Sequence, residues 1–104
     1  MTPAQAIAKL DRQIAAHGQA IGFARGAVTK SARGFVRGYR PEQLVGLITQ
    51  QEREVIVSPS SLGDFAPRAQ DDFQTMGRFG RVMAAEPIHM DGVLVRWNLT
   101  VRLT

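Results

Sequence analysis

The sequence predicts a mainly β fold, namely a small antiparallel β-barrel or sandwich with one N-terminal α-helix. Residues 3–17 carry the start signal, the apolar spacing and the stop signal of a helix. After Gly18 the apolar residues begin to alternate, and the closing stretch from Val93 to Leu103 alternates almost without fault. A chain of 104 residues has the usual length of one domain. Residues 1–104 are therefore expected to form a single domain, with the barrel over about residues 19–104.

The helix is expected over about residues 3–17. Thr2 is a good cap, Pro3 suits the first helical position, and Gln5 can complete a capping box with Thr2. Gly18 is a suitable stop. The apolar residues at helical spacing are Ile7, Leu10 and Ile14. This stripe is narrow, so the helix should pack on one surface only.

The rest of the chain is predicted to form five or six strands. The first includes Ile21 and Phe23, and residues 26–31 connect it to a second strand that includes residues 35–39. A short β-branched strand at residues 54–58 stops at Ser58-Pro59-Ser60-Ser61, and residues 62–71 have the composition of a loop. Strands with interruptions at Gly77, Gly80 and Pro87 follow. Asp91-Gly92 is a strong hairpin signal before the final strand, whose Val93, Val95, Trp97, Leu99, Val101 and Leu103 should face the core.

Basic residues are concentrated in the first forty positions. Residues 1–40 contain seven basic side chains and one acid, whereas residues 41–104 contain six basic and eight acidic ones. Five basic residues follow one another without an intervening acid: Arg25, Lys30, Arg33, Arg37 and Arg40. Such asymmetry favours DNA or an acidic protein face as a partner, and a solvated basic face is the alternative.

Catalytic, metal-binding and cofactor-binding patterns are not found in the sequence. There is no cysteine, and neither His17 nor His89 has an acid or nucleophile pattern nearby. The adjacent carboxylates of Asp71 and Asp72 should point in different directions. No glycine-rich phosphate loop is present, and no apolar run approaches the roughly 18 residues of a membrane span. We therefore expect no enzyme, no cofactor, no metal and no membrane partner.

Two short stretches have the outline of nucleic-acid motifs. Residues 33–39 begin like the RNP1 motif, with a basic residue, a glycine and an aromatic, but Val36 and Arg37 then depart from it. Aromatics among arginines on a strand could stack bases; the favoured alternative packs Phe35 and Tyr39 inward and leaves Arg37 at the rim. Residues 77–80 match the GXXG outline, but that loop lies between helices. A tight basic turn is predicted there instead.

A long loop is predicted over about residues 40–53, yet it contains an apolar cluster. The cluster consists of Leu44, Val45, Leu47 and Ile48. It either folds back on its own barrel or contacts a neighbouring subunit, and the polar residues that flank it suit the rim of an interface. The acidic Glu42, Glu52 and Glu54 could meet the basic stretch of a neighbouring copy. Such head-to-tail contacts form rings when the rotation closes.

Several stretches resemble one known family when they are taken in order. They are VRGYRPEQLVGLITQQEREVIVSPSSL, PRAQDDF, MGRFGRVMAAEP and VLVRWNLTVRL, within residues 34–104. The matching positions are Gly38-Tyr39, Pro41-Glu42, Val55 to Pro59, and Asp72, which opens a hairpin. The pattern is similar to the head–tail connector proteins of tailed phages, the head-completion, stopper or head–tail joining group. A difference lies at Asp71-Asp72-Phe73, where a Gly-Asp turn is more usual in the family.

The resemblance implies a small β-barrel that assembles as a homo-oligomeric ring, six- or twelve-fold, at the head–tail junction of a virion. Such a ring lies between a portal or adaptor protein above and a tail-terminator or tail protein below. It helps to retain DNA in the head, and phage-like gene transfer agents use the same type of component. The chain would then be made in the bacterial cytoplasm and would be structural. The alternatives are a small nucleic-acid-binding β-barrel and a tail-terminator-type ring component, which has an α/β fold.

Overall fold

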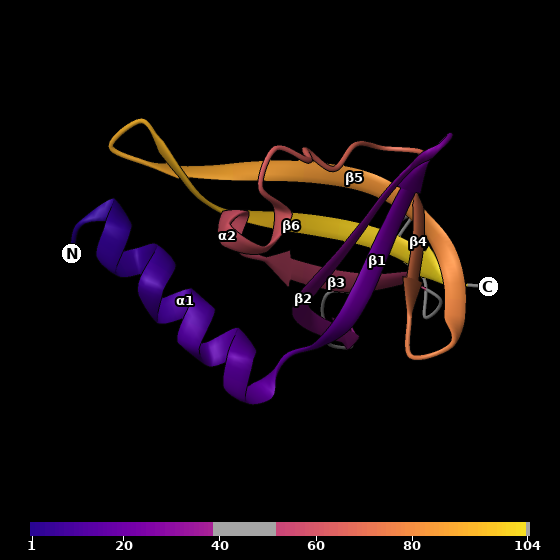
Figure 1. Cartoon of the computed structure of the whole chain (residues 1–104), viewed down its shortest axis with the longest axis horizontal. Coiled ribbons are helices and arrows are strands. Elements are labelled where there is room, and N and C mark those ends of the chain that lie inside the picture. Colours follow the sequence, from indigo (N-terminus) through magenta and orange to yellow (C-terminus); the bar gives the residue numbers. More distant parts are fainter. Residues whose placement is uncertain (39–51, 104) are drawn as a thin grey trace.

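The computed structural model describes residues 1–38 and 52–103, which form a closed antiparallel barrel with a helix on its outside (Figure 1). The strand order around the barrel is β1-β2-β3-β6-β5-β4, and β4 closes the barrel by pairing with β1. The elements in chain order are α1 (Pro3–His17), β1 (Gln19–Arg25), β2 (Val28–Gly38), β3 (Glu52–Val57), α2 (Pro59–Leu62), β4 (Asp72–Thr75), β5 (Arg78–Met90) and β6 (Val93–Leu103). The predicted mainly β fold is confirmed, and closure decides for a barrel over a sandwich.

The N-terminal helix has the bounds that the sequence predicts. The Thr2 hydroxyl accepts a hydrogen bond from the Gln5 N–H at 3.1 Å, and the Gln5 side chain accepts one from the Thr2 N–H at 2.8 Å. This capping box satisfies two backbone donors at the helix start. Ile14 is the one fully buried residue of α1. The helix contacts the outer wall of the barrel at β2 and β6. The narrow apolar stripe thus packs on one surface, as expected.

The barrel is filled by its own side chains. Its core consists of Ile21, Phe23, Val55, Val57, Leu62, Phe73, Val82, Leu99, Val101 and Leu103. Phe23 lies at the centre of an aromatic group, with ring centroids 5.5 Å from Phe73 and 5.6 Å from Phe65. The alternation predicted for the last strand is confirmed, except that Val93 is exposed at the hairpin tip. A packed interior leaves the outer walls and the ends of the barrel for contacts with other molecules.

Two local predictions are wrong, and one short helix was not predicted. Residues 26–31 are not a connection, because β2 begins at Val28 and only Gly26 and Ala27 form the turn, with Gly26 at a φ of 60°. β3 does stop before Ser58, as predicted, but Ser58 then caps the short helix α2, whose Leu62 enters the core. β5 runs without a break from Arg78 to Met90. Gly80 and Pro87 both pair with β6, and the two register shifts lie between Val82 and Ala84 and between Ile88 and His89.

Gly80 has a packing role within β5. It pairs with Phe73 of β4 on one side and with Leu103 of β6 on the other. A Cβ at this position would overlap the carbonyl oxygen of Arg102. The glycine therefore permits the close approach of β5 and β6 where the barrel closes, and it does not end the strand.

The predicted inward packing of Phe35 is also wrong. The side chain of Val36 packs against the core, whereas Phe35 pairs with Ile56 on the opposite, outer face of the sheet. Phe35 is half-buried on this face, and α1 contacts the same strand from outside the barrel. The wall therefore tolerates an aromatic residue outside the barrel.

The predicted loop at 40–53 ends earlier than expected. β3 already begins at Glu52, which is buried and pairs with Arg102 of β6. Tyr39, Arg40 and the apolar cluster of Leu44, Val45, Leu47 and Ile48 lie outside the described residues. Their predicted roles therefore stay predictions.

Candidate interaction surfaces

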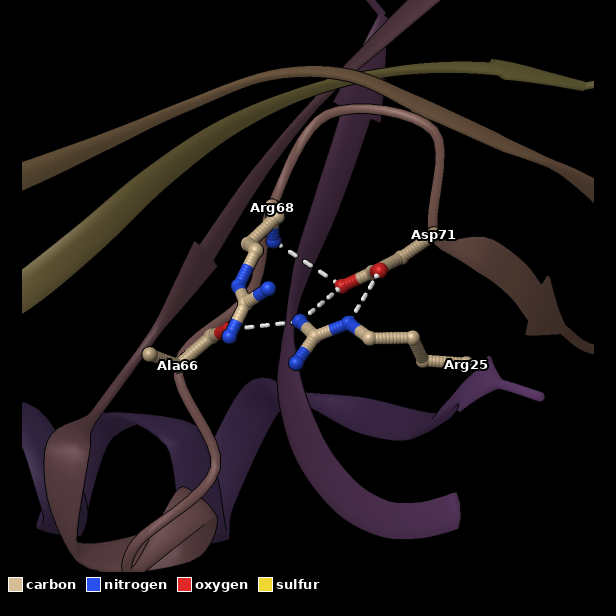
Figure 2. A network of polar contacts seen from close by, with 4 residues as sticks. All are labelled: Arg25, Ala66, Arg68 and Asp71. Atoms are coloured by element: carbon tan, nitrogen blue, oxygen red, sulfur yellow. Dashed lines mark hydrogen bonds and ion pairs between the residues drawn. The ribbon is translucent and has the colours of Figure 1, made fainter. Parts of the chain in front are cut away.

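Arg25, one of the predicted partner contacts, is engaged within the chain. It lies at the end of β1, where its Nε donates to Asp71 Oδ1 at 2.8 Å and its Nη2 donates to Asp71 Oδ2 at 2.7 Å. Nη2 also donates to the Ala66 carbonyl, and the backbone N–H of Arg68 donates to the same Asp71 carboxylate (Figure 2). The guanidinium lies 4.8 Å from the centroid of the Phe65 ring. This two-bond geometry fixes the orientation of the arginine.

The Asp71 carboxylate is 3% exposed, so its ionisation depends on these donors. Burial raises the pKa of Asp71, but the hydrogen bonds from Arg25 and Arg68 and the positive charge of both residues outweigh burial. The net result is a pKa below the ordinary value of an aspartate. For Arg25, the Asp71 hydrogen bond is the main cause of a pKa raised above its ordinary value. The charged pair is thus the stable form at neutral pH.

The Arg25–Asp71 pair attaches the segment between α2 and β4 to the barrel. On one side of Asp71, the Gln70 N–H donates to the Val82 carbonyl at 2.7 Å. The Val82 N–H in turn donates to the Asp71 carbonyl at 2.8 Å. Arg25 holds the same segment from β1. Its position therefore gives it a structural role, which the sequence alone did not suggest.

The other predicted basic contacts divide into engaged and available side chains. Arg37 of β2 forms an ion pair with Glu54 of β3, directly across the strand pair. The exposed Arg33 donates to the Gly18 carbonyl at 2.7 Å. Lys30 is half-buried and makes no ion pair with any described residue. The described basic residues therefore do not form one continuous surface, because two of them bind acids of their own chain.

Two of the acids predicted to meet a neighbour are also paired inside the chain. Glu52 binds Arg102 at 2.8 Å, and Glu54 binds Arg37. Their strand register places these partners opposite one another, and the sequence could not show it because the register depends on pairing between distant strands. Of the acids proposed for a contact between copies, Glu42 alone lies outside the described residues.

An apolar groove lies between α1 and the β5–β6 hairpin. In Figure 1 the hairpin extends past the rest of the barrel toward the N-terminal end of α1. The groove has a volume of about 410 Å³, and its apolar lining includes Ala6, Leu10, Ile88, Met90 and Val95. Two basic side chains, Lys9 and Arg96, complete it. We call this feature the helix–hairpin groove.

A second depression lies on the wall formed by β1, β2, β4 and β5. It has a volume of about 430 Å³ and is lined by small residues such as Gly22, Ala24 and Ser31, with Phe79 also in the lining. Phe79 is 63% exposed, and Met76 in the adjoining β4–β5 turn is 76% exposed. The tight basic turn predicted at residues 77–80 is wrong in its extent, because Met76 and Gly77 form the turn and Arg78 to Gly80 already belong to β5. We call this surface the small-residue trough.

Metal and membrane features add little to these surfaces. In the part of the chain that the structure describes, no three histidine, aspartate or glutamate side chains gather as a metal site requires. No helix among residues 1–38 and 52–103 has the length and apolar character needed to span a membrane. Comparisons with protein-family models, with curated proteins and with solved structures find no match for the chain.

Proposed function

We propose that the chain is a structural neck protein of a tailed phage or phage-like particle. It would form a ring that joins the portal or adaptor to the tail and helps to retain DNA in the head. One observation carries the proposal, which is that two depressions with different linings lie at different places on one closed barrel. The helix–hairpin groove adjoins β6 and the small-residue trough adjoins β1, and these strands are opposite each other in the strand order.

Two unlike surfaces at different places on the barrel suit a subunit that contacts its neighbours head to tail. A heterologous contact of this kind closes into a ring when each step rotates by a fixed fraction of a turn. The exposed Phe79 and Met76 at the trough are apolar side chains that a partner could cover. The resemblance of residues 34–104 to head–tail connectors adds the location, and the subunit number of six or twelve comes from that resemblance alone.

The nucleic-acid-binding alternative has less support from the described side chains. It relied on Phe35, Tyr39 and the arginines around them. Phe35 is half-buried on the wall that α1 contacts, and Arg37 is held by Glu54. Neither side chain is presented as a free stacking or phosphate-binding group. The tail-terminator alternative called for an α/β fold, whereas the described residues form an antiparallel barrel with one helix longer than a single turn.

The experiment changes the apolar cluster in the full chain. We expect the double variant Leu44→Asp with Ile48→Asp to fold as a monomer but to stop particle assembly at the neck, because charged side chains oppose an apolar subunit contact. Circular dichroism and thermal unfolding check the fold, and electron microscopy counts particles with joined tails. The matched control is Thr49→Asp with Gln50→Asp, which adds the same charge beside the cluster. Normal tailed particles from the cluster variant would contradict the proposal.

A further inference from the structure

We propose that the helix–hairpin groove is the docking site for residues 42–48 of a second copy of the chain. This inference rests on the proposed ring function and names the contact that would build the ring. The groove supplies apolar walls from α1 and from the β5–β6 hairpin, with Lys9 and Arg96 beside them. Its occupant should therefore combine apolar side chains with a carboxylate.

Arg96 supplies the main evidence that the groove is incomplete. It is half-buried, and its Nε is enclosed without a hydrogen-bond partner. Among the described residues it forms no ion pair, in contrast to Arg25, Arg37, Arg81 and Arg102. A half-buried guanidinium without a carboxylate is costly, and an arriving acid with a hydrogen-bond acceptor would relieve that cost.

The segment 42–48 has the required chemistry. Glu42 provides a carboxylate, and it is followed within two to six residues by Leu44, Val45, Leu47 and Ile48. The acid can meet Arg96 and Lys9 while the apolar residues cover the groove walls. Glu52 and Glu54 are paired within the chain, so Glu42 is the acid of the three that this proposal assigns to the groove.

Strand directions favour a second copy over the same chain as the source of this segment. β2 ends at Gly38, which pairs with Arg53, and Arg53 pairs with Val101 near the end of β6. Arg96 lies near the start of β6. Measured from Gly38, it is about 17 Å away along the strand direction and about 10 Å away across two strand spacings. The chain also leaves β2 at the end of the barrel away from Arg96.

The test uses cysteine cross-linking, because the chain has no cysteine of its own. Full-length Leu47→Cys and Met90→Cys variants are mixed and oxidised, and Met90 lines the groove. We expect a covalent heterodimer with twice the mass of the 11.4 kDa chain. The matched control pairs Leu47→Cys with Asp64→Cys, an exposed position in neither depression, which should cross-link at least tenfold less.

Charge reversal then tests the role of Arg96. Arg96→Glu in the Met90→Cys protein should reduce the heterodimer at least fivefold, and Glu42→Arg in the Leu47→Cys partner should restore it. Arg12→Glu is the control, because it makes the same charge change on α1 outside the groove lining. If Arg96→Glu unfolds the chain, Arg96→Met keeps the apolar stem and removes the charge, and it should reduce the heterodimer in the same direction.

Three results would overturn the inference. They are equal cross-linking of the groove pair and the Asp64 control pair, no effect of either Arg96 change, and an intramolecular cross-link in a single chain that carries both cysteines without any heterodimer. The last result would mean that the segment covers its own groove. The proposed function fails separately, because it requires the chain in particle necks whichever surface joins the copies.

Discussion

Arg25 and Arg96 are both half-buried arginines on the barrel, but their surroundings differ. Arg25 has a buried carboxylate that accepts two of its hydrogen bonds, a carbonyl that accepts a third, and an aromatic ring beneath it. Arg96 has an apolar groove around it and no described acid as a partner. The comparison teaches that an arginine in the basic stretch can be used up within its own chain, as Arg25 is. An arginine outside that stretch, such as Arg96, can instead be available to another molecule.

The largest effect is expected from removing Asp71. Asp71→Ala leaves Arg25 half-buried without its acid and removes the acceptor of the Arg68 N–H, so the free energy of unfolding should fall by about 2–3 kcal/mol. Urea unfolding followed by circular dichroism measures the loss. Glu54→Ala is the control, because its partner Arg37 is largely exposed, and it should cost no more than about 1 kcal/mol. Equal losses would erase the distinction between a structural and a surface pair.

A pH series measures the same pair in another way. Because the pKa of Asp71 is lower in the folded state than its ordinary value of about 3.9, the pair adds stability above that value. This contribution should be lost as the pH falls through the folded-state pKa. The gap in melting temperature between the wild type and Asp71→Asn should therefore be constant from pH 7 to about pH 5 and should shrink below about pH 4. A gap that widens toward low pH would contradict the assignment.

The smallest effect is expected from Arg96. Arg96→Met removes an enclosed donor that has no partner and keeps the length of the side chain, so the free energy of unfolding should change by less than about 0.5 kcal/mol or rise slightly. Urea unfolding on the monomer measures it, beside the Asp71→Ala variant. A loss as large as that of Asp71→Ala would show that Arg96 is structural like Arg25, and the contrast between the two would disappear.

The sequence predicted those parts of the fold that depend on local signals. The capping box at Thr2, the turn at Asp91-Gly92 and the alternation of the last strand each depend on neighbouring residues, and all three are confirmed. The prediction that Phe35 faces inward was wrong, because the facing of β2 depends on its register with strands distant in the sequence. The run of β5 through Gly80 was missed, since the glycine serves an approach between strands that are far apart in sequence.

The candidate surfaces were less predictable than the fold. Charge counting identified the basic stretch but could not show that Asp71 lies beside Arg25, 46 positions away in the chain. It also overlooked Arg96, whose significance depends on α1 and the β5–β6 hairpin forming a groove around it. Its apolar neighbours come from both ends of the sequence, so no local pattern connects them. The predicted contact cluster at 44–48 lies outside the described residues.

The most direct test of the proposed function is the position of the chain in purified particles. Electron cryo-microscopy of the neck, combined with mass spectrometry of the particle proteins, would locate it. We expect a closed ring of six or twelve copies between the portal or adaptor and the tail, with neighbouring barrels in contact through the helix–hairpin groove. Absence of the chain from particles that have complete necks, or a monomer placed elsewhere in the particle, would contradict the account.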